Sequence, residues 1–367
     1  MDAKLILFII VIVLGVILNL WKTSERSKCK FYVISIISLL ILESCLRSVD
    51  VGNDTQSYFN AFRDITNTSW SEIWDSFYEA YMMGSGKDPG FMVFMKLAQF
   101  VSKDFNVFLF ICALVFFVPL GIILYRYSDR IIQLVFAFSL YLTLFHIVAL
   151  SGVRQQLATG FTFMAFLFVG KQQYWKSVIF ILLGSLIHVS ATLFLFVPLL
   201  YVFGKKIIKT AHLASLVLVP AIALSSSSIM LYLASFLAND YYSGYGTYNT
   251  EGGAMTYIVL MSLLSLFCFI AIRKNALNEN QNLSLFYVML PLLTLTVPLT
   301  SLNGAMIRVG QYFTLYMTLL VPFAFDLISD KKSNSIFYLI AIVVLFVMSL
   351  RGEGLYYTFF WQNIAAI

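Results

Sequence analysis

Charged residues are scarce in this sequence: Asp, Glu, Lys and Arg make up 11% of its 367 residues, whereas hydrophobic residues make up 60%. A soluble domain carries about 25% charged residues, so this chain is too apolar to cover itself with a polar surface. The chain also lacks a glycine-rich nucleotide-binding loop, an HExxH motif and a cluster of carboxylates suited to a divalent metal. These absences argue against an ATP-driven pump and a metalloprotease, and we expect neither a metal nor another cofactor.

Cysteine is rare as well, and no pair of cysteines has a metal-binding spacing. The four cysteines stand singly in or beside apolar segments, at Cys29, Cys45, Cys112 and Cys268. We interpret them as small hydrophobic residues. The formal net charge of +6 is spread over short basic clusters between apolar runs, as the positive-inside rule describes for membrane proteins. We therefore expect contact with membrane lipids and none with nucleic acid.

The apolar residues fall into repeated runs of about 20 residues, the length that a helix needs to span a hydrocarbon core of about 30 Å. The sequence thus predicts an all-α fold, a polytopic membrane helix bundle in which residues 1–367 form one transmembrane domain. About ten full spans are expected, at residues 5–20, 31–46, 107–125, 131–150, 157–170, 211–233, 257–272, 283–299, 311–327 and 336–350. Residues 91–101, with Lys96 in the middle, and residues 178–202, with His188 near the centre, are expected to be short re-entrant or partial segments.

Basic clusters set the predicted orientation. The cluster after the first span contains Lys22, Arg26, Lys28 and Lys30. Because such clusters stay in the cytoplasm, both chain ends should lie outside. Residues 47–89 then form a large, acidic external loop. Two half-helices that meet near His188 would bring the basic residues 205–209 back to the cytoplasmic side.

Three arginines stand at the outer ends of predicted spans, where the orientation rule does not require them. They are Arg47 in CLRSVD, Arg154 in LSGVRQQLA and Arg308 in GAMIRVGQYF. An arginine there is costly unless it meets a carboxylate, a phosphate or a carbonyl group. Because the planar guanidinium can donate two parallel hydrogen bonds, the set favours a shared anionic ligand such as a phosphate. The alternative is structural pairing, for instance of Arg47 with Glu43 one helical turn earlier.

Acidic and histidine side chains add candidates on the same outer side. Asp54 and Tyr58 are four residues apart and share one helix face, although Asp54 could serve only as a helix N-cap. Asp88 precedes a proline and therefore lies in a turn or extended position, where it too could be a cap. His188 lies where the two half-helices meet and could act as a base or hydrogen-bond donor, or simply pack.

At these residues the sequence resembles a known family. The resembling segments, in chain order, are GNDTQSYFNAF, DPGFMVFMKLAQF, SGVRQQLATGFTFMAF, SLIHVSATLFLFVPL, MIRVGQYF and YYTFFW. They resemble the EpsG-like branch of the Wzy polysaccharide polymerases, which make O-antigen, capsule or exopolysaccharide. The resemblance implies a bacterial cytoplasmic membrane protein, active at the outer face, that is related in architecture to membrane glycosyltransferases of the GT-C class.

The resemblance also implies substrates and roles. The donor and acceptor would be oligosaccharide repeat units linked to undecaprenyl diphosphate, and a chain-length regulator is a further expected partner. Arg154 and Arg308 would bind the diphosphate, with support from Arg47. Asp54 and then His188 are the expected bases.

The remaining expected substrate contacts are Tyr58, Asp88, Gln155 and Tyr312, and aromatic residues of the external loop could stack on sugars. Three alternatives stay open: a flippase or transporter of the same lipid-linked glycan, an O-antigen ligase, and an acyltransferase with His146 as its base.

Overall fold

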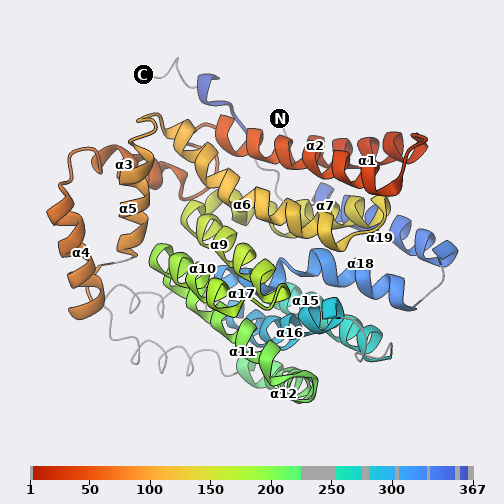
Figure 1. Ribbon diagram of the computed structural model, residues 1–367. Helices are drawn as coiled ribbons and strands as arrows, with labels where there is room; N and C mark the ends of the chain where they lie inside the picture. Colours follow the sequence, from red (N-terminus) through yellow and green to blue (C-terminus); the bar gives the residue numbers. More distant parts are fainter. Residues whose placement is uncertain are drawn as a thin grey trace. The chain divides into compact units, whose positions relative to one another are not determined.

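The computed structural model describes residues 3–86, 88–224, 253–274, 281–301, 306–328, 331–351 and 356–362. Nearly all of these residues are helical (Figure 1). Within these ranges the chain forms no β-strand, although Arg47 and Phe359 make an isolated antiparallel bridge. The predicted all-α class is therefore confirmed.

Among the described residues, six helices are long and apolar enough to cross a membrane. They are, or lie within, α1 (Ala3–Leu20), α2 (Glu25–Leu46), α6 (Phe105–Tyr127), α15 (Gly253–Lys274), the span formed by α16 (Gln281–Thr296) with η3 (Val297–Ser301), and α19 (Lys331–Arg351). A seventh arises if α17 (Ile307–Thr314) and α18 (Met317–Ile328), bent by 43° at their junction, count as one span.

Two of the other predicted spans correspond to shorter apolar helices, residues 131–150 to α7 (Ile131–Leu144) and residues 211–233, in part, to the apolar part of α12 (Lys205–Leu224). The two segments predicted to be re-entrant or partial overlap the short helices α5 (Pro89–Ala98) and α10 (Tyr174–Ile187). Part of the predicted span 211–233 lies outside the described residues. The polytopic membrane helix bundle is confirmed, and the count of ten full spans stays a prediction.

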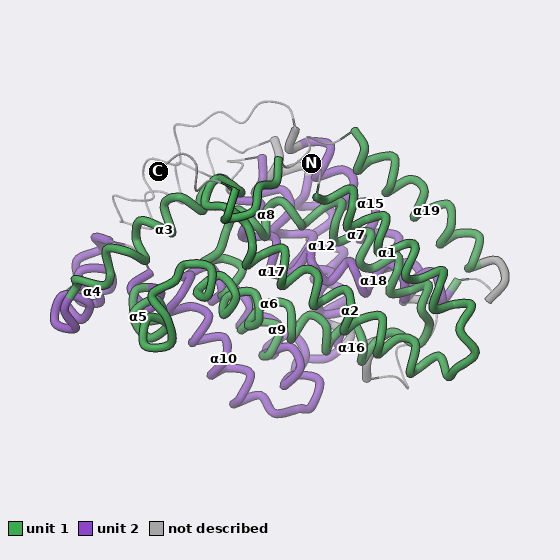
Figure 2. The backbone as a smooth tube through the Cα atoms, turned by 90° about the horizontal axis from the view of Figure 1, so that it is seen from above, with its two compact units in different colours: residues 1–68, 92–164, 328–367 green, residues 69–91, 165–327 purple. Residues whose placement is uncertain are grey.

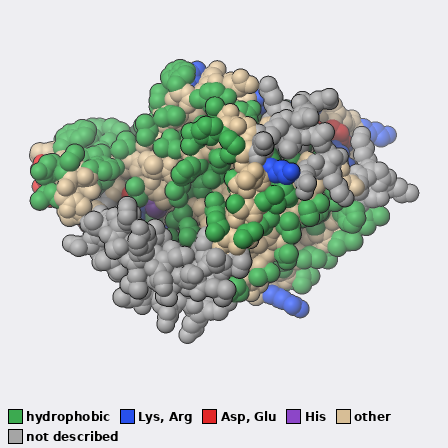
Figure 3. Space-filling model, turned by 90° about the horizontal axis from the view of Figure 1, so that it is seen from below, with side chains coloured by type: hydrophobic (Ala, Val, Ile, Leu, Met, Phe, Trp, Pro, Cys, Tyr) green, Lys and Arg blue, Asp and Glu red, His purple; other side chains and the backbone are tan. Residues whose placement is uncertain are grey.

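Many helices expose apolar faces. On α19, Leu339, Ile340 and Val343 are each more than half exposed, and Figure 3 shows hydrophobic side chains over much of one face of the molecule. Exposed apolar area on this scale would be a liability in water. Lipid chains are the solvent that such faces fit, and the helical hydrogen bonds leave few backbone groups unsatisfied there.

The chain divides into two compact units (Figure 2). Unit 1 comprises Met1–Thr68, Met92–Met164 and Ile328–Ile367, and unit 2 comprises Ser69–Phe91 and Ala165–Leu327. The two units therefore share the residues of the predicted external loop. Each unit is described by itself below, and the single-domain prediction stays a prediction.

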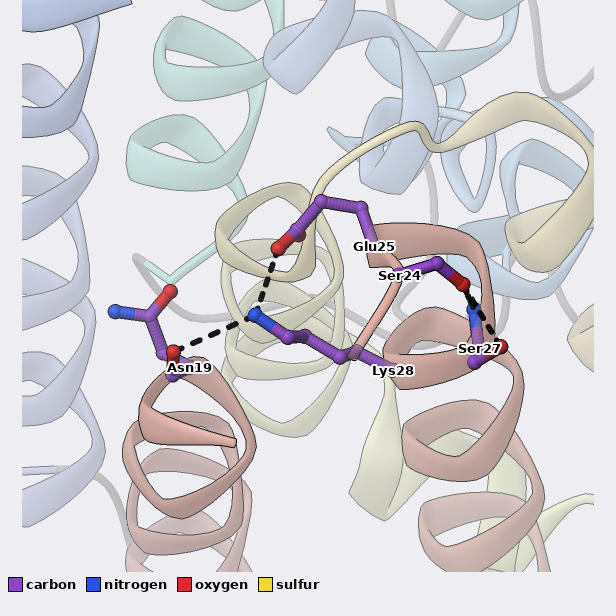
Figure 4. A network of polar contacts seen from close by, with 5 residues as sticks. All are labelled: Asn19, Ser24, Glu25, Ser27 and Lys28. Atoms are coloured by element: carbon purple, nitrogen blue, oxygen red, sulfur yellow. Dashed lines mark hydrogen bonds and ion pairs between the residues drawn. The ribbon is translucent and has the colours of Figure 1, made fainter. Parts of the chain in front are cut away.

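In unit 1, α1 and α2 form a hairpin, and α2 packs along α6 (Figure 1). Gly121 of α6 permits close packing, because a Cβ there would come within 2.9 Å of Ile37 on α2. Figure 4 shows Lys28, one residue of the predicted basic cluster, near the hairpin turn. Lys28 Nζ bonds to Glu25 Oε1 at 2.9 Å and to the Asn19 carbonyl at 3.4 Å. The cation thus stabilises the end of α1, where carbonyl groups lack helical partners.

Lys96 lies in the otherwise apolar sequence of the short helix α5, and its contacts explain this position. Lys96 Nζ donates to the backbone carbonyls of Ile65, Thr66 and Thr68, at 2.9, 3.1 and 2.9 Å. These carbonyls follow α3 (Thr55–Asp64), so the ammonium group binds the C-terminal end of that helix. Its position reflects this contact rather than exposure to lipid.

In unit 2 the chain folds back at His188. Helix α10 ends at Ile187, and a 3₁₀ segment, η1 (Val189–Leu195), leads into α11 (Phe196–Phe203). The Thr192 hydroxyl donates to the Ser185 hydroxyl at 3.0 Å, whereas residues seven apart in a straight helix are separated by about 10 Å along its axis. The helix break predicted at His188 is therefore present.

Candidate functional site

Arg47 is buried directly after α2. Its side chain is 1% exposed, and its Nη1 donates to Ser44 Oγ at 3.0 Å. Asn106 Nδ2 donates to the carbonyls of Cys45 and Arg47, at 2.6 and 3.2 Å, and so caps the helix end. Burial lowers the pKa of Arg47 to about 10, opposed by the nearby Glu43 carboxylate. The guanidinium therefore stays charged at neutral pH.

The C-terminal segment of the chain lies against this helix end. Arg47 bridges to Phe359, and the Ser48 amide donates to the Thr358 carbonyl at 2.8 Å. The Tyr357 hydroxyl donates to the backbone carbonyl of Glu43 at 2.7 Å. Three successive residues of the YYTFFW segment thus contact the end of α2, a contact that the sequence did not indicate.

Glu43 pairs with a histidine rather than with Arg47. Both of its carboxylate oxygens lie 2.8–2.9 Å from Nε2 of His146, and both side chains are buried. His146 begins the short helix α8 (His146–Ser151), which follows a break after α7. The carboxylate contacts Nε2 and leaves Nδ1 of the ring without a hydrogen-bond partner among the described residues, so the acyltransferase alternative with His146 as its base stays open.

The loop before α3 contacts the break between α8 and α9 (Val153–Gly170). Gly52 has φ +93°, and a Cβ there would lie 2.9 Å from the Leu150 carbonyl. The Asn53 amide bonds to Ser151 Oγ at 3.3 Å. Asp54 and Arg154 therefore follow two loops that touch each other.

Three further predicted residues of this region lie on α3 and α9 or at their ends. Asp54 occupies the N-cap position of α3, yet its side chain makes no capping hydrogen bond. Tyr58, one turn later, is buried. Gln155 is buried on α9, with its Nε2 3.5 Å from Thr159 Oγ1. Unit 1 thus holds five predicted residues: Arg47, Asp54, Tyr58, Arg154 and Gln155.

Unit 2 brings three predicted residues together at the His188 break. Asp88 has φ +47°, which is unusual for a residue with a side chain, and its Oδ1 accepts from the Val189 amide at 3.0 Å. A Cβ on Gly90 would overlap the Leu186 carbonyl, so the start of α5 packs directly on the end of α10. Asp88 therefore fixes the backbone of the break.

Ser190 links the histidine to a tyrosine. Its hydroxyl lies 3.1 Å from Nδ1 of His188 and donates to the Tyr312 hydroxyl at 3.4 Å. Tyr312 is fully buried on α17, and the partly exposed Arg308 lies one turn earlier on the same helix. Sequence reasoning missed Ser190, although its place two residues after the histidine was a usable signal.

Comparison with known proteins identifies the chain. A model of the EpsG family matches residues 29–351. The matched range contains each resembling segment except YYTFFW, which follows it. No curated protein and no solved structure matches the chain, so the relation to GT-C glycosyltransferases stays a prediction. Because the family model covers most of the sequence, the chain belongs to the EpsG family.

Proposed function

We propose that this protein is a membrane polysaccharide polymerase that joins oligosaccharide repeat units linked to undecaprenyl diphosphate, at the outer face of the bacterial cytoplasmic membrane. The observation that carries the proposal is the family match over residues 29–351, which includes all three outer arginines and the histidine at the helix break. A chain-length regulator as partner is an expectation from the family resemblance.

The proposed reaction is a glycosyl transfer. The bond between the anomeric carbon of the donor sugar and the diphosphate oxygen breaks, and the diphosphate leaves with the electron pair. A hydroxyl oxygen of the acceptor sugar forms the new bond to that carbon and gives up its proton to a base. Negative charge grows on the leaving diphosphate, so guanidinium groups that bind it more tightly at that moment lower the barrier. We assign this role to Arg154 and Arg308, with Arg47 in support.

His188 is the base that the local geometry favours. The Ser190 hydroxyl donates its hydrogen to Tyr312, and the tautomer of the ring with a proton on Nδ1 is the one that can donate to Ser190 in turn. A neutral imidazole protonated on Nδ1 carries its lone pair on Nε2, which is the atom that would take the acceptor proton. Asp88, expected from the sequence to touch substrate, is proposed instead to position this histidine through the Val189 amide. Asp54, the first expected base from the sequence, becomes the second candidate in this proposal.

The test uses purified protein in detergent with synthetic lipid-linked repeat units, analysed as a ladder of polymer lengths. We expect polymer from the wild type and only single repeats on the carrier from Arg154→Ala and Arg308→Ala. Arg63→Ala is the matched control, because Arg63 is exposed and pairs only loosely with Asp64, at 3.8 Å. Normal long polymer from both arginine variants would refute the assignment.

A flippase of the same glycan is the second candidate, favoured by the buried pair of Glu43 and His146, since ionisable groups inside membrane proteins often serve transport. Transfer of the labelled lipid across a vesicle bilayer, with no polymer formed and with dependence on Glu43, would favour this alternative.

A further inference from the structure

A second polar cluster lies inside unit 1, at the outer end of α2. Arg47, Tyr141 and His146 are each 1% exposed. Tyr141 interacts electrostatically with Arg47 and Glu43, and its ring meets the His146 ring edge-on at 6.4 Å. Within the part of the chain that the structure describes, Arg47 Nε and Nη2, the Tyr141 hydroxyl and His146 Nδ1 have no hydrogen-bond partner. Buried polar atoms are almost always bonded, so four such atoms in one cluster need an explanation.

These atoms are chiefly donors. Arg47 Nε and Nη2 can only donate, and the Tyr141 hydroxyl carries one further hydrogen. His146 Nε2 must be protonated, because it lies between two carboxylate oxygens. Its Nδ1 then accepts in the neutral ring and donates in the imidazolium form. What the cluster lacks is an acceptor with several oxygens.

Glu43 does not meet this need. Its carboxylate offsets the charge of Arg47, but its oxygens are bonded by His146. A buried guanidinium with most of its N–H groups unbonded is unfavourable even beside a countercharge. A phosphate group matches the demand, because its oxygens can accept two parallel bonds from the arginine fork and others from nearby donors.

The C-terminal segment Tyr357–Phe359 lies against the side of the cluster formed by the end of α2. Its contacts with α2 and the following residue are the Tyr357 bond to Glu43, the Thr358 bond to Ser48 and the bridge between Phe359 and Arg47. This segment follows the residues matched by the family model. An extended segment held by so few bonds can lift from a helix end at small cost, since local openings of this kind lie at the low end of protein stability.

We propose that Arg47, Tyr141 and His146 form a phosphate-binding site that the C-terminal segment closes. The ligand is a phosphate or diphosphate group, either free or as the headgroup of a lipid. The lipid source rests on the proposed function, whereas the anion site itself does not. Opening of the segment would admit the anion to donors that are otherwise unbonded.

The test is a titration of the full-length protein in detergent with pyrophosphate. The quantity measured at each concentration is the midpoint of thermal unfolding. A ligand that binds the folded state raises this midpoint. We expect a rise for the wild type and about a tenfold or greater loss of affinity in Arg47→Lys, which keeps the charge and loses the fork. Tyr141→Phe removes one donor and should weaken binding several-fold.

Matched controls separate the site from general destabilisation. Tyr32→Phe makes the same change at another buried tyrosine of unit 1, whose hydroxyl donates to the Val11 carbonyl. Arg63→Lys makes the same change at an exposed arginine. Both should bind pyrophosphate as the wild type does. Tyr357→Phe loosens the C-terminal segment, so its midpoint should rise at lower pyrophosphate concentrations than that of the wild type.

A parallel titration with undecaprenyl diphosphate in nanodiscs distinguishes the sources. Protection by the lipid alone supports a headgroup site, and equal protection by pyrophosphate supports a site for free phosphate. The proposal is overturned if neither ligand shifts the midpoint of the wild type or of Tyr357→Phe. It is also overturned if the shift survives in both Arg47→Lys and Tyr141→Phe. In either case internal water would satisfy the unbonded polar atoms. Polymerisation without any such shift refutes the site alone. A shift that depends on Arg47, without polymerisation, refutes the proposed function alone.

Discussion

Removal of the Ser190 hydroxyl tests whether the network at the helix break serves the base. Ser190→Ala deletes the contact of 3.1 Å to His188 and the bond of 3.4 Å to Tyr312. A neutral hydrogen bond contributes about 1 kcal/mol, so the loss of one or both corresponds to about 1–2 kcal/mol, or a factor of about 5 to 30. Because the lost contacts orient the ring rather than bind sugar, the decrease should fall on kcat while KM for the acceptor stays unchanged.

The assay is the initial rate of repeat-unit joining with synthetic lipid-linked substrates. Ser190→Thr keeps a hydroxyl and should restore most of the rate, whereas His188→Gln removes the base and should cost about 10²–10⁴-fold. Ser185→Ala is the matched control, because the Ser185 hydroxyl bonds to Thr192 and to the Ile181 carbonyl at the same break. Full activity of Ser190→Ala, or an equal loss in Ser185→Ala, would refute the reasoning.

Two further predictions concern the elements that hold the candidate sites. Lys96→Met removes three bonds to the end of α3 and should lower the free energy of unfolding by about 2–4 kcal/mol. Chemical unfolding in detergent measures the change, and an equal change in Lys103→Met, at an exposed lysine, would contradict it. Gly90→Ala places a Cβ into the Leu186 carbonyl and should cost about 1–3 kcal/mol with a larger loss of polymerase rate; a variant with normal rate and stability would show that the break adapts.

The sequence was a good guide to the membrane fold because hydrophobic length is a strong, local signal. The helix break at His188 also followed from sequence, since an unbroken span would have put residues 205–209 on the wrong side. The lengths of the individual helices could not be predicted from the sequence. Breaks such as the one after Leu144 depend on packing and backbone geometry, which leave no clear mark in an apolar run.

The partners of the candidate residues could not be predicted from the sequence. The alternative to a shared anionic ligand was a pair of Arg47 with Glu43, because residues four apart share a helix face. Arg47, however, lies beyond the last helical residue of α2 with extended backbone, so the turn-to-turn geometry ends before it. Glu43 pairs instead with His146, 103 residues away in the chain. Long-range pairs of this kind are set by tertiary packing.

Helix breaks explain why polar residues gather where they do. His146 begins α8, Arg154 lies in the first turn of α9, and His188 separates α10 from η1. A break inside a membrane protein leaves backbone groups unbonded, and polar side chains must satisfy them. Asp88 does this for Val189, so a polar residue at a break is not by itself evidence for chemistry. The stronger evidence is a buried polar atom that the fold leaves unused, and for that reason the donors of Arg47 mark a ligand site more clearly than the carboxylate of Asp88.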